Sequence, residues 1–142
     1  MIDIENLIVD KVNTAVASLL TKYPKLKVVS EYVETSAEFP LICVMEEDNY
    51  THRESQTADL QEHEANVMYA VYIYTTGKNK KSAAKEIANV VDTEMQNNLF
   101  TRTMTSQISN IDRTVYRMVI RYTAVVWPVV NGENVTFQMY RR

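Results

Sequence analysis

The segment from Thr114 to Trp127, TVYRMVIRYTAVVW, alternates residue types so regularly that it predicts one long β-strand. Successive side chains of a strand point to opposite sides of a sheet, so this segment has two different faces. One face is apolar throughout: Tyr116, Met118, Ile120, Tyr122, Ala124 and Val126. The other face places two charged side chains among uncharged ones: Val115, Arg117, Val119, Arg121, Thr123, Val125 and Trp127. We expect the first face to bury against a core and the second to meet water or a partner.

Length and composition predict a single globular domain over residues 1–142. The 46% apolar and 23% charged residues are ordinary globular values. A chain of this size buries roughly 70% of the surface that its unfolded form exposes, so it needs no covalent staple. The single cysteine, Cys43, lies in the apolar run Leu41–Met45 and is expected to be a small buried side chain. One thiol forms no intramolecular disulfide, which is compatible with a reducing compartment.

The net charge of −3 is unevenly distributed along the chain. Residues 46–64 contain one basic residue, Arg53, and seven acidic ones: Glu46, Glu47, Asp48, Glu54, Asp59, Glu62 and Glu64. That segment is therefore −6 and the remainder +3. This asymmetry favours contact with copies of itself or with another protein, and it argues against general nucleic-acid binding. No stretch approaches the roughly 20 apolar residues of a membrane span and no signal-peptide pattern opens the chain, so we expect a cytosolic protein without membrane contact.

Two segments have the apolar periodicity of amphipathic helices. The first runs from a capping Asp3 to Tyr23, and Pro24 enforces its end. The second runs from about Ser82 to Leu99, with one apolar stripe: Ala84, Ile87, Ala88, Val91 and Met95. We expect both stripes to pack on the apolar face of the long strand, through Leu7, Leu19, Ile87 and Val91.

The remaining regular segments are typical of strands. Leu26–Glu34 predicts a half-exposed strand, whereas Leu41–Met45 and Val67–Tyr74 are apolar on both faces and predict buried ones. Phe100–Ile108 forms a hairpin with the long strand. Pro128 marks a sheet edge or bend. Asn131 and Gly132 make a turn into a last strand, Asn134–Tyr140.

The predicted fold class is therefore α+β, in the order α-β-β-β-α-β-β-β. We expect a mainly antiparallel sheet of five to six strands with the two amphipathic helices packed on one face. The polar segment 46–64 has too few apolar residues to bury, so it either extends the flanking strands into a projecting hairpin or orders only on assembly. Deleting Asp48–Glu62 should then leave the fold intact and abolish assembly.

Candidate chemistry in the sequence is sparse. His52 and His63 lie near several carboxylates and offer metal-ligand atoms, but their spacing matches no metal motif, so we expect no metal. Gly77 and Lys78 lack the spacing of a phosphate loop. A group of lysines surrounds the start of the second helix, where they could hold an anion, although we expect a solvated helix end instead: Lys78, Lys80, Lys81 and Lys85. No nucleophile is paired with a base, so we expect neither an enzyme nor a cofactor.

Three runs of residues follow the second helix: Asn97, Asn98, Leu99, Phe100, Thr101 and Arg102; then Asn110, Ile111 and Asp112; then Tyr116 to Tyr122. Together with the element order, these runs resemble the tail-terminator or tail-completion proteins of long-tailed bacteriophages. The resemblance covers most of the chain as a pattern of elements with few distinctive residues. Members of that family often have a glycine before the phenylalanine, where this chain has Leu99.

The resemblance implies a structural virion protein, made in the host cytoplasm, whose ring, expected to have six subunits, caps the tail tube and meets the head connector. Its partners would be its own copies, the tail tube protein and the connector or stopper protein. The family offers no catalytic residues. The alternatives are another head–tail joining or tail-tube-like subunit and, from a different class, a cytosolic metal-dependent enzyme using His52 and His63.

Charge and exposure select the expected interface residues: Glu46, Glu47, Asp48, His52, Arg53, Glu54, Asp59, Arg117 and Arg121. Two unpaired guanidinium groups are costly to bury, so Arg117 and Arg121 are expected either in water or beside carboxylates. Those carboxylates would belong to a neighbouring subunit, with Glu46, Glu47 and Asp48 as candidates, or to the same chain. Replacing both arginines with glutamate should leave the monomer stable and block assembly.

Overall fold

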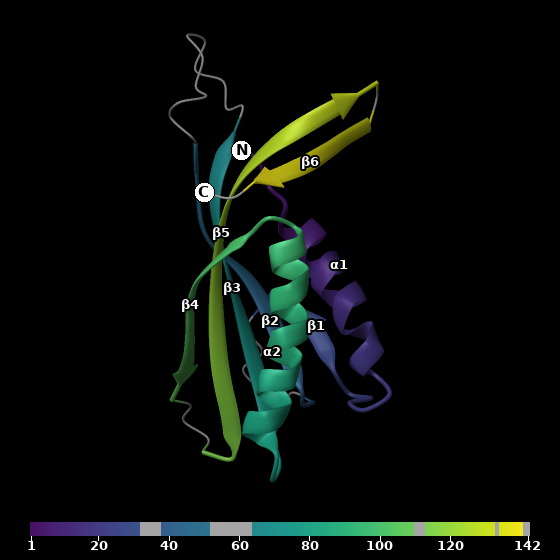
Figure 1. Cartoon of the computed structure of the whole chain (residues 1–142), viewed down its shortest axis with the longest axis vertical. Coiled ribbons are helices and arrows are strands. Elements are labelled where there is room, and N and C mark those ends of the chain that lie inside the picture. Colours follow the sequence, from purple (N-terminus) through teal and green to yellow (C-terminus); the bar gives the residue numbers. More distant parts are fainter. Residues whose placement is uncertain (32–37, 52–63, 110–112, 133, 141–142) are drawn as a thin grey trace.

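The computed structural model describes residues 1–31, 38–51, 64–109, 113–132 and 134–140 (Figure 1). Its elements follow in the order α1 (Glu5–Val16), a short 3-10 helix (Ala17–Leu19), β1 (Lys27–Val29), β2 (Leu41–Thr51), β3 (Ala65–Thr76), α2 (Lys80–Asn97), β4 (Thr101–Ile108), β5 (Val115–Asn131) and β6 (Asn134–Tyr140). The α+β class predicted from the sequence is confirmed.

The strands form one six-stranded sheet in the order β1-β2-β3-β5-β4, with β6 also paired to β5. The sheet is mixed, because β1 is parallel to β2 whereas the other pairings are antiparallel. A parallel neighbour needs a long connection rather than a tight turn, and the chain between Val29 and Leu41 supplies it. The expected central position of residues 67–74 is confirmed, since β3 lies between β2 and β5.

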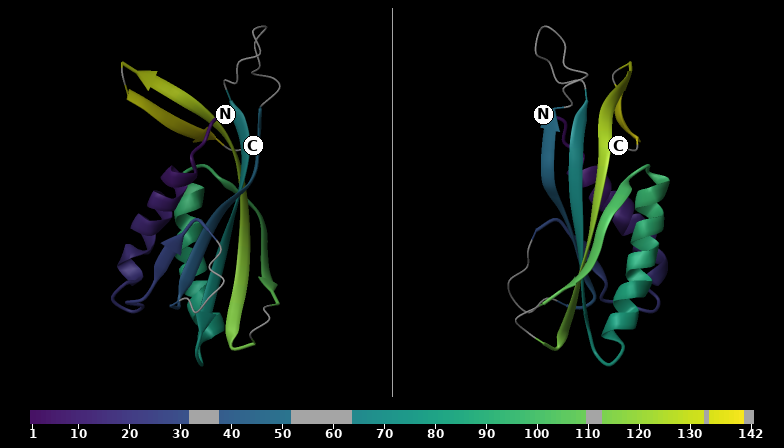
Figure 2. Two further views of the ribbon diagram at one scale, coloured as in Figure 1. Left: turned by 180° about the vertical axis from the view of Figure 1, so that it is seen from behind. Right: turned by 60° about the vertical axis from the view of Figure 1, so that its left-hand side comes forward.

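The long strand β5 organises the sheet by using one edge twice. Its residues Arg117–Thr123 pair with β4, and Val125–Asn131 pair with β6 on the same edge. The other edge pairs with β3 only as far as Val126. Pro128 thus lies where β5 has lost β3 as a neighbour, which is where a residue without an N–H is tolerated. The β5–β6 hairpin projects beyond the helices as a result (Figure 2).

The apolar face of β5 lies in the main core, as predicted. Tyr116, Met118, Ile120 and Tyr122 share one buried cluster with both helices, which contribute Ile8, Val12, Val16, Ile87 and Val91 among others. We call this the helix side of the sheet. α2 packs over β3 and β5, whereas α1 lies against α2, β1 and β2. Leu7 and Leu19 pack at the border of the cluster and are only partly buried.

The opposite face, here called the arginine side, is less exposed than the sequence predicts. Val119 and Val125 are buried, and Val119 forms a second apolar cluster with Cys43, Ala70 and Tyr72. Partly buried side chains border this cluster: Val29, Met45, Tyr74, Met104 and Ile108. The expectation that this face simply meets water or a partner is therefore wrong for its centre, because neighbouring strands supply long side chains that cover it.

The helix ends differ from prediction in informative ways. α1 ends at Val16 and passes into the 3-10 helix instead of continuing to Tyr23. α2 ends in a left-handed turn at Leu99, whose φ is +65°. The Phe100 N–H donates to the Met95 carbonyl and the Leu99 N–H to the Gln96 carbonyl, both at 3.0 Å. This is a Schellman arrangement, in which glycine is favoured at the position that Leu99 occupies.

The acidic segment is partly strand. β2 and β3 pair out to Thr51 and Ala65, so the flanking strands extend well beyond the predicted Met45 and Val67. Residues 52–63, which contain His52, Arg53, Glu54, Asp59 and His63, lie outside the described residues.

Candidate functional site

The register aligns side chains on the arginine side into rows across the sheet. Tyr74 of β3 lies opposite Arg117 of β5, which lies opposite Ile108 of β4. The next row joins Tyr72, Val119 and Ser106, and the one after joins Ala70, Arg121 and Met104. Arg117 and Arg121 are thus separated by a row centred on the buried Val119, and each has its own surroundings.

Arg121 is satisfied within its own chain. Its Nε donates to Oε2 of Glu47 at 2.7 Å, and its Nη1 lies 3.3 Å from Sδ of Met104. The Tyr72 hydroxyl donates to the other oxygen of the same carboxylate at 3.1 Å. The hydrogen bond to Glu47 raises the pKa of Arg121 above its ordinary value. Glutamate at position 121 would place a second carboxylate beside Glu47, so this replacement would cost the monomer stability.

Glu46 and Glu47, grouped together by the sequence, lie on opposite sides of the sheet. The β2–β3 register shifts between Glu46 and Asp48, as in a β-bulge, and Glu47 has no counterpart in the ladder. Glu46 accepts a hydrogen bond from the Tyr69 hydroxyl on the helix side at 3.3 Å. Asp48 is exposed. The structure therefore joins Glu47 to Arg121 and removes Glu46 from both arginines.

Glu46 belongs instead to an acidic cluster at the start of α1. Carboxylate oxygens of Asp3, Glu5 and Glu46 all lie within 4.8 Å of one another, and such oxygens suit a hard divalent cation. Burial, followed by the charges of Asp3 and Glu46, raises the pKa of Glu5. Asn49 partly compensates the repulsion, since its amide donates to Glu46 at 2.8 Å. These residues differ from the histidines that the sequence suggested as ligands.

Arg117 forms no ion pair with a carboxylate of the described residues. Its guanidinium carbon lies 4.9 Å from the ring centre of Tyr72 and 5.6 Å from that of Tyr74. Guanidinium groups are attracted to aromatic faces at such distances. Its Nε is buried and has no hydrogen-bond partner among the described residues.

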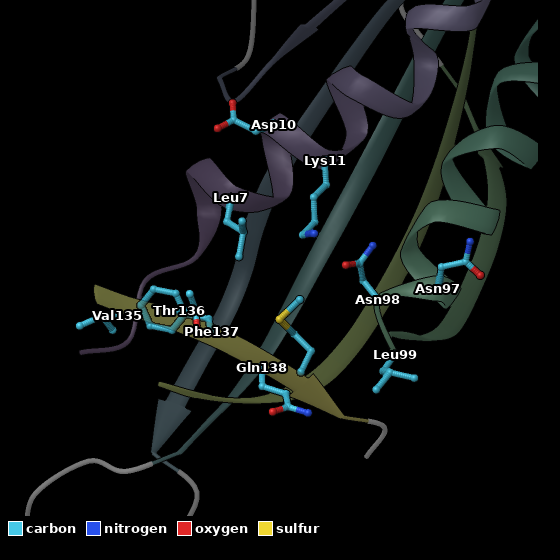
Figure 3. Close-up of a pocket in the computed structure, with 11 residues that line it drawn as sticks. Leu7, Asp10, Lys11, Asn97, Asn98, Leu99, Val135, Thr136, Phe137 and Gln138 are labelled. Atoms are coloured by element: carbon cyan, nitrogen blue, oxygen red, sulfur yellow. The ribbon is translucent and has the colours of Figure 1, made fainter. Parts of the chain in front are cut away.

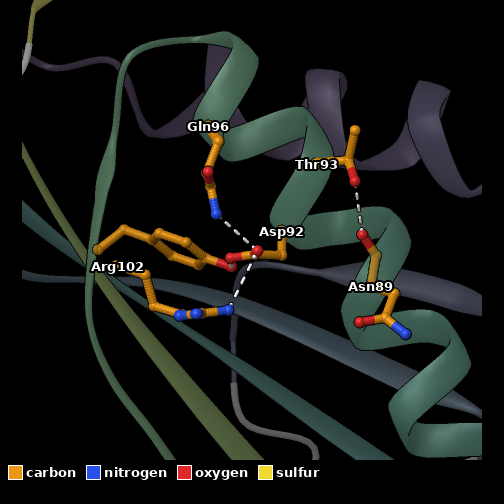
Figure 4. A network of polar contacts seen from close by, with 6 residues as sticks. Asn89, Asp92, Thr93, Gln96 and Arg102 are labelled. Carbon is orange, nitrogen blue, oxygen red and sulfur yellow. Dashed lines mark hydrogen bonds and ion pairs between the residues drawn. The ribbon is translucent and has the colours of Figure 1, made fainter.

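A separate polar cluster, which the sequence did not reveal, joins α2 to the sheet on the helix side (Figure 4). The Asp92 carboxylate accepts from the Tyr122 hydroxyl at 2.8 Å, from Gln96 at 2.7 Å and from Arg102 at 3.1 Å. Both carboxylate oxygens are thus occupied by donors from α2, β4 and β5. The arrangement is suited to holding the helix in place and offers no activated nucleophile.

A groove of about 700 Å³ lies between α1, the end of α2 and β6 (Figure 3). Leu7 and Lys11 line it from α1, Phe137 and Met139 from β6, and Leu99 from the turn after α2. Leu99 and Val135 are 41% and 54% exposed at this groove. Cys43 is not among the lining residues of this groove. Burial raises the pKa of the Cys43 thiol to about 11, so the thiol stays protonated at neutral pH.

Comparison with known proteins adds no identification, since no protein-family model and no curated protein matches this sequence. None of the described helices combines the length and apolar character needed to cross a membrane.

Proposed function

We propose that this protein is a structural subunit of a bacteriophage virion, a tail-terminator or tail-completion protein that forms a ring on the tail tube and joins it to the head connector. The fold proposed for such a subunit has the order α-β-β-β-α-β-β-β, with both helices on one face of the sheet. We also propose that the protein is located at the head-proximal end of the tail. The proposal begins from the sequence resemblance and is supported by the physical features that follow.

The observation that carries it is the projecting end of the sheet. β5 and β6 continue past the helices as a two-stranded hairpin (Figure 1). Val129 and Val135 on this hairpin are 37% and 54% exposed, and Tyr50 near the end of β2 is 41% exposed. A two-stranded ribbon is marginal alone, and apolar residues on its surface favour a protein contact. A subunit that joins copies of itself and two further proteins needs such surfaces outside its core.

The edges of the sheet support the same role. At the level of Val125 and Val126 the strands follow the order β2, β3, β5 and β6, so that β2 and β6 form the two borders of the sheet there among the described residues. β1 pairs with β2 only as far as Cys43. Open strand edges are templates for pairing with another chain, and two different edges on one subunit allow head-to-tail association into a ring.

Native mass spectrometry and electron microscopy of the purified protein test the proposal. We expect closed rings, alone or after addition of tail tubes. Val135→Asp should prevent ring formation while leaving the melting temperature of the monomer within about 2 °C, because Val135 is already more than half exposed. Leu20→Asp is the matched control, since Leu20 is 44% exposed near the other end of α1.

Open filaments in place of rings would favour the tail-tube-like alternative, because a contact that does not close by rotation continues into a helical polymer. A monomer at all concentrations that also fails to bind tail tubes would contradict the proposal.

A further inference from the structure

A pocket at the base of the β4–β5 hairpin gathers positive charge from three parts of the chain. Its volume is about 450 Å³, and its charged lining residues are Lys80 at the start of α2, Arg113 before β5 and Arg117 within β5. Gln107 and Ser109 add polar groups from the end of β4. The described lining contains no aspartate or glutamate. The sequence favoured a solvated helix end near Lys80 over an anion site, and it did not indicate that two arginines join that lysine.

Within the described part of the chain, the three cations have N–H donors left for a ligand. Lys80 Nζ donates to the Arg113 carbonyl at 3.0 Å, which uses one of its three N–H groups and holds it at the pocket. Arg113 is exposed. Arg117 is held by the rings of Tyr72 and Tyr74, and its buried Nε lacks a hydrogen-bond partner among the described residues. A buried donor of this kind costs free energy unless a ligand or water satisfies it.

The contrast with Arg121 strengthens the inference. Arg121 lies four residues away on the same face and has a carboxylate at 2.7 Å. Arg117 carries the same charge and lies against the rings of Tyr72 and Tyr74, but among the described residues a pocket takes the place of a carboxylate beside it. The start of α2 adds its own positive end, and its N-cap residue Asn79 makes no side-chain capping hydrogen bond.

We propose that this pocket binds an oxyanion, with Arg117 and Lys80 as direct donors and Arg113 closing its exposed side. Phosphate and carboxylate share the chemistry that fits, namely several negatively charged oxygens that accept from a guanidinium fork and an ammonium. The ligand is either a free anion or a carboxylate presented by a second copy of the chain. The site does not require ring formation.

Nuclear magnetic resonance of the full chain tests the site, with the Arg117 Nε–H as the reporter. Sodium phosphate is titrated against sodium chloride at constant ionic strength. We expect the Arg117 Nε–H and the Ser109 amide to shift with saturation. Arg113→Gln and Arg117→Gln should each weaken binding by about tenfold or more, since each removes a charged hydrogen-bond donor. Lys25→Gln, which removes an exposed positive charge outside the pocket, should leave the affinity unchanged.

A dilution series without added phosphate separates the two sources of the oxyanion. Phosphate-dependent shifts in the dilute monomer identify a free anion. Shifts that depend on protein concentration and disappear in Arg113→Gln identify a carboxylate of a second copy.

Asp112 precedes Arg113 in the sequence and lies outside the described residues. The phosphate titration is therefore repeated with Asp112→Asn, which tests whether the Asp112 carboxylate occupies the pocket. Phosphate binding seen only in Asp112→Asn would show that the chain fills its own pocket and would overturn the proposal. If neither the wild type nor Asp112→Asn shows any shift, with phosphate or with protein concentration, the proposal is also overturned.

Discussion

The two faces of the sheet are covered by different kinds of residues. On the helix side, tyrosine, isoleucine and methionine of β5 enter one continuous apolar core with α1 and α2. On the arginine side, a small apolar cluster around Val119 is flanked by a satisfied charge at Arg121 and an aromatic-supported one at Arg117. The first side is organised mainly by burial, with the Asp92 cluster as its polar addition. The second depends on which strand residues the register brings together, and it is therefore the side on which specific recognition is more readily built.

Ile120→Ala should show the largest effect and measures how much the helix side contributes. Ile120 is 2% exposed within the main core. Its truncation should lower the free energy of unfolding by about 2–5 kcal/mol, the usual range for a buried aliphatic side chain that leaves a cavity. Urea denaturation followed by circular dichroism measures the change.

Val119→Ala is its counterpart, since Val119 is fully buried but belongs to the smaller cluster. If Ile120→Ala lowers the free energy of unfolding by less than about 1 kcal/mol and Val119→Ala lowers it by more, the arginine side contributes more to stability than the helix side.

Leu99→Gly tests whether the helix side carries backbone strain at the end of α2. Leu99 has a left-handed φ of +65° and is 41% exposed, so glycine would relieve strain and lose little burial. We expect the free energy of unfolding to rise by about 0.5–1 kcal/mol. Thermal melts measure it, with Asn97→Gly as the control, because glycine within the last turn of the helix should destabilise. Equal losses from both changes would mean that Leu99 contributes packing that outweighs its strain.

The Glu47–Arg121 pair sharpens the comparison on the arginine side. Both side chains are partly exposed, so a double-mutant cycle with Glu47→Gln and Arg121→Gln should give a coupling free energy of about 0.5 kcal/mol. High salt should reduce it. A coupling above about 2 kcal/mol would show that this pair behaves as a buried one, and that the arginine side is more enclosed than its exposure indicates.

Glu5→Gln should have the smallest effect and concerns the acidic cluster on the helix side. The folded pKa of Glu5 is raised above its ordinary 4.5, so the folded state binds its proton more tightly than the unfolded state does. This contribution to stability is present below the unfolded pKa and is lost as pH rises through the folded pKa. Glu5→Gln should therefore gain a few tenths of a kcal/mol over the wild type between pH 4 and pH 7. A constant difference across that range would remove Glu5 as the titrating group.

Residue periodicity in the sequence predicted which faces of β5 and α2 enter the main core. Alternation in β5 assigned Tyr116 and Ile120 to the core, and the stripe of α2 placed Ile87 and Val91 there. The turn at Gly132 and the central position of β3 also follow from local residue types.

Features that depend on pairing were not predictable from periodicity. The shift at Glu47 puts adjacent glutamates on opposite sides, and only the register reveals that Glu47 meets Arg121. The Asp92 cluster draws its donors from three elements, so no single stretch of sequence indicates it. The parallel pairing of β1 likewise arises from a connection whose path no local pattern specifies.

The pairing of β3 with β5 has a consequence for how the chain acquires its structure. This central ladder joins Ala65 to Val126 and Thr76 to Val115, so all of α2 and β4 lies between the partners. Contacts so distant in sequence close slowly, and we expect folding in milliseconds to seconds rather than microseconds. During synthesis the edge of β3 that pairs with β5 stays open until β5 has left the ribosome. β4 and β5, by contrast, can pair as soon as both are made. The nascent chain is therefore most prone to aggregate in the interval after β3 emerges and before β5 is complete.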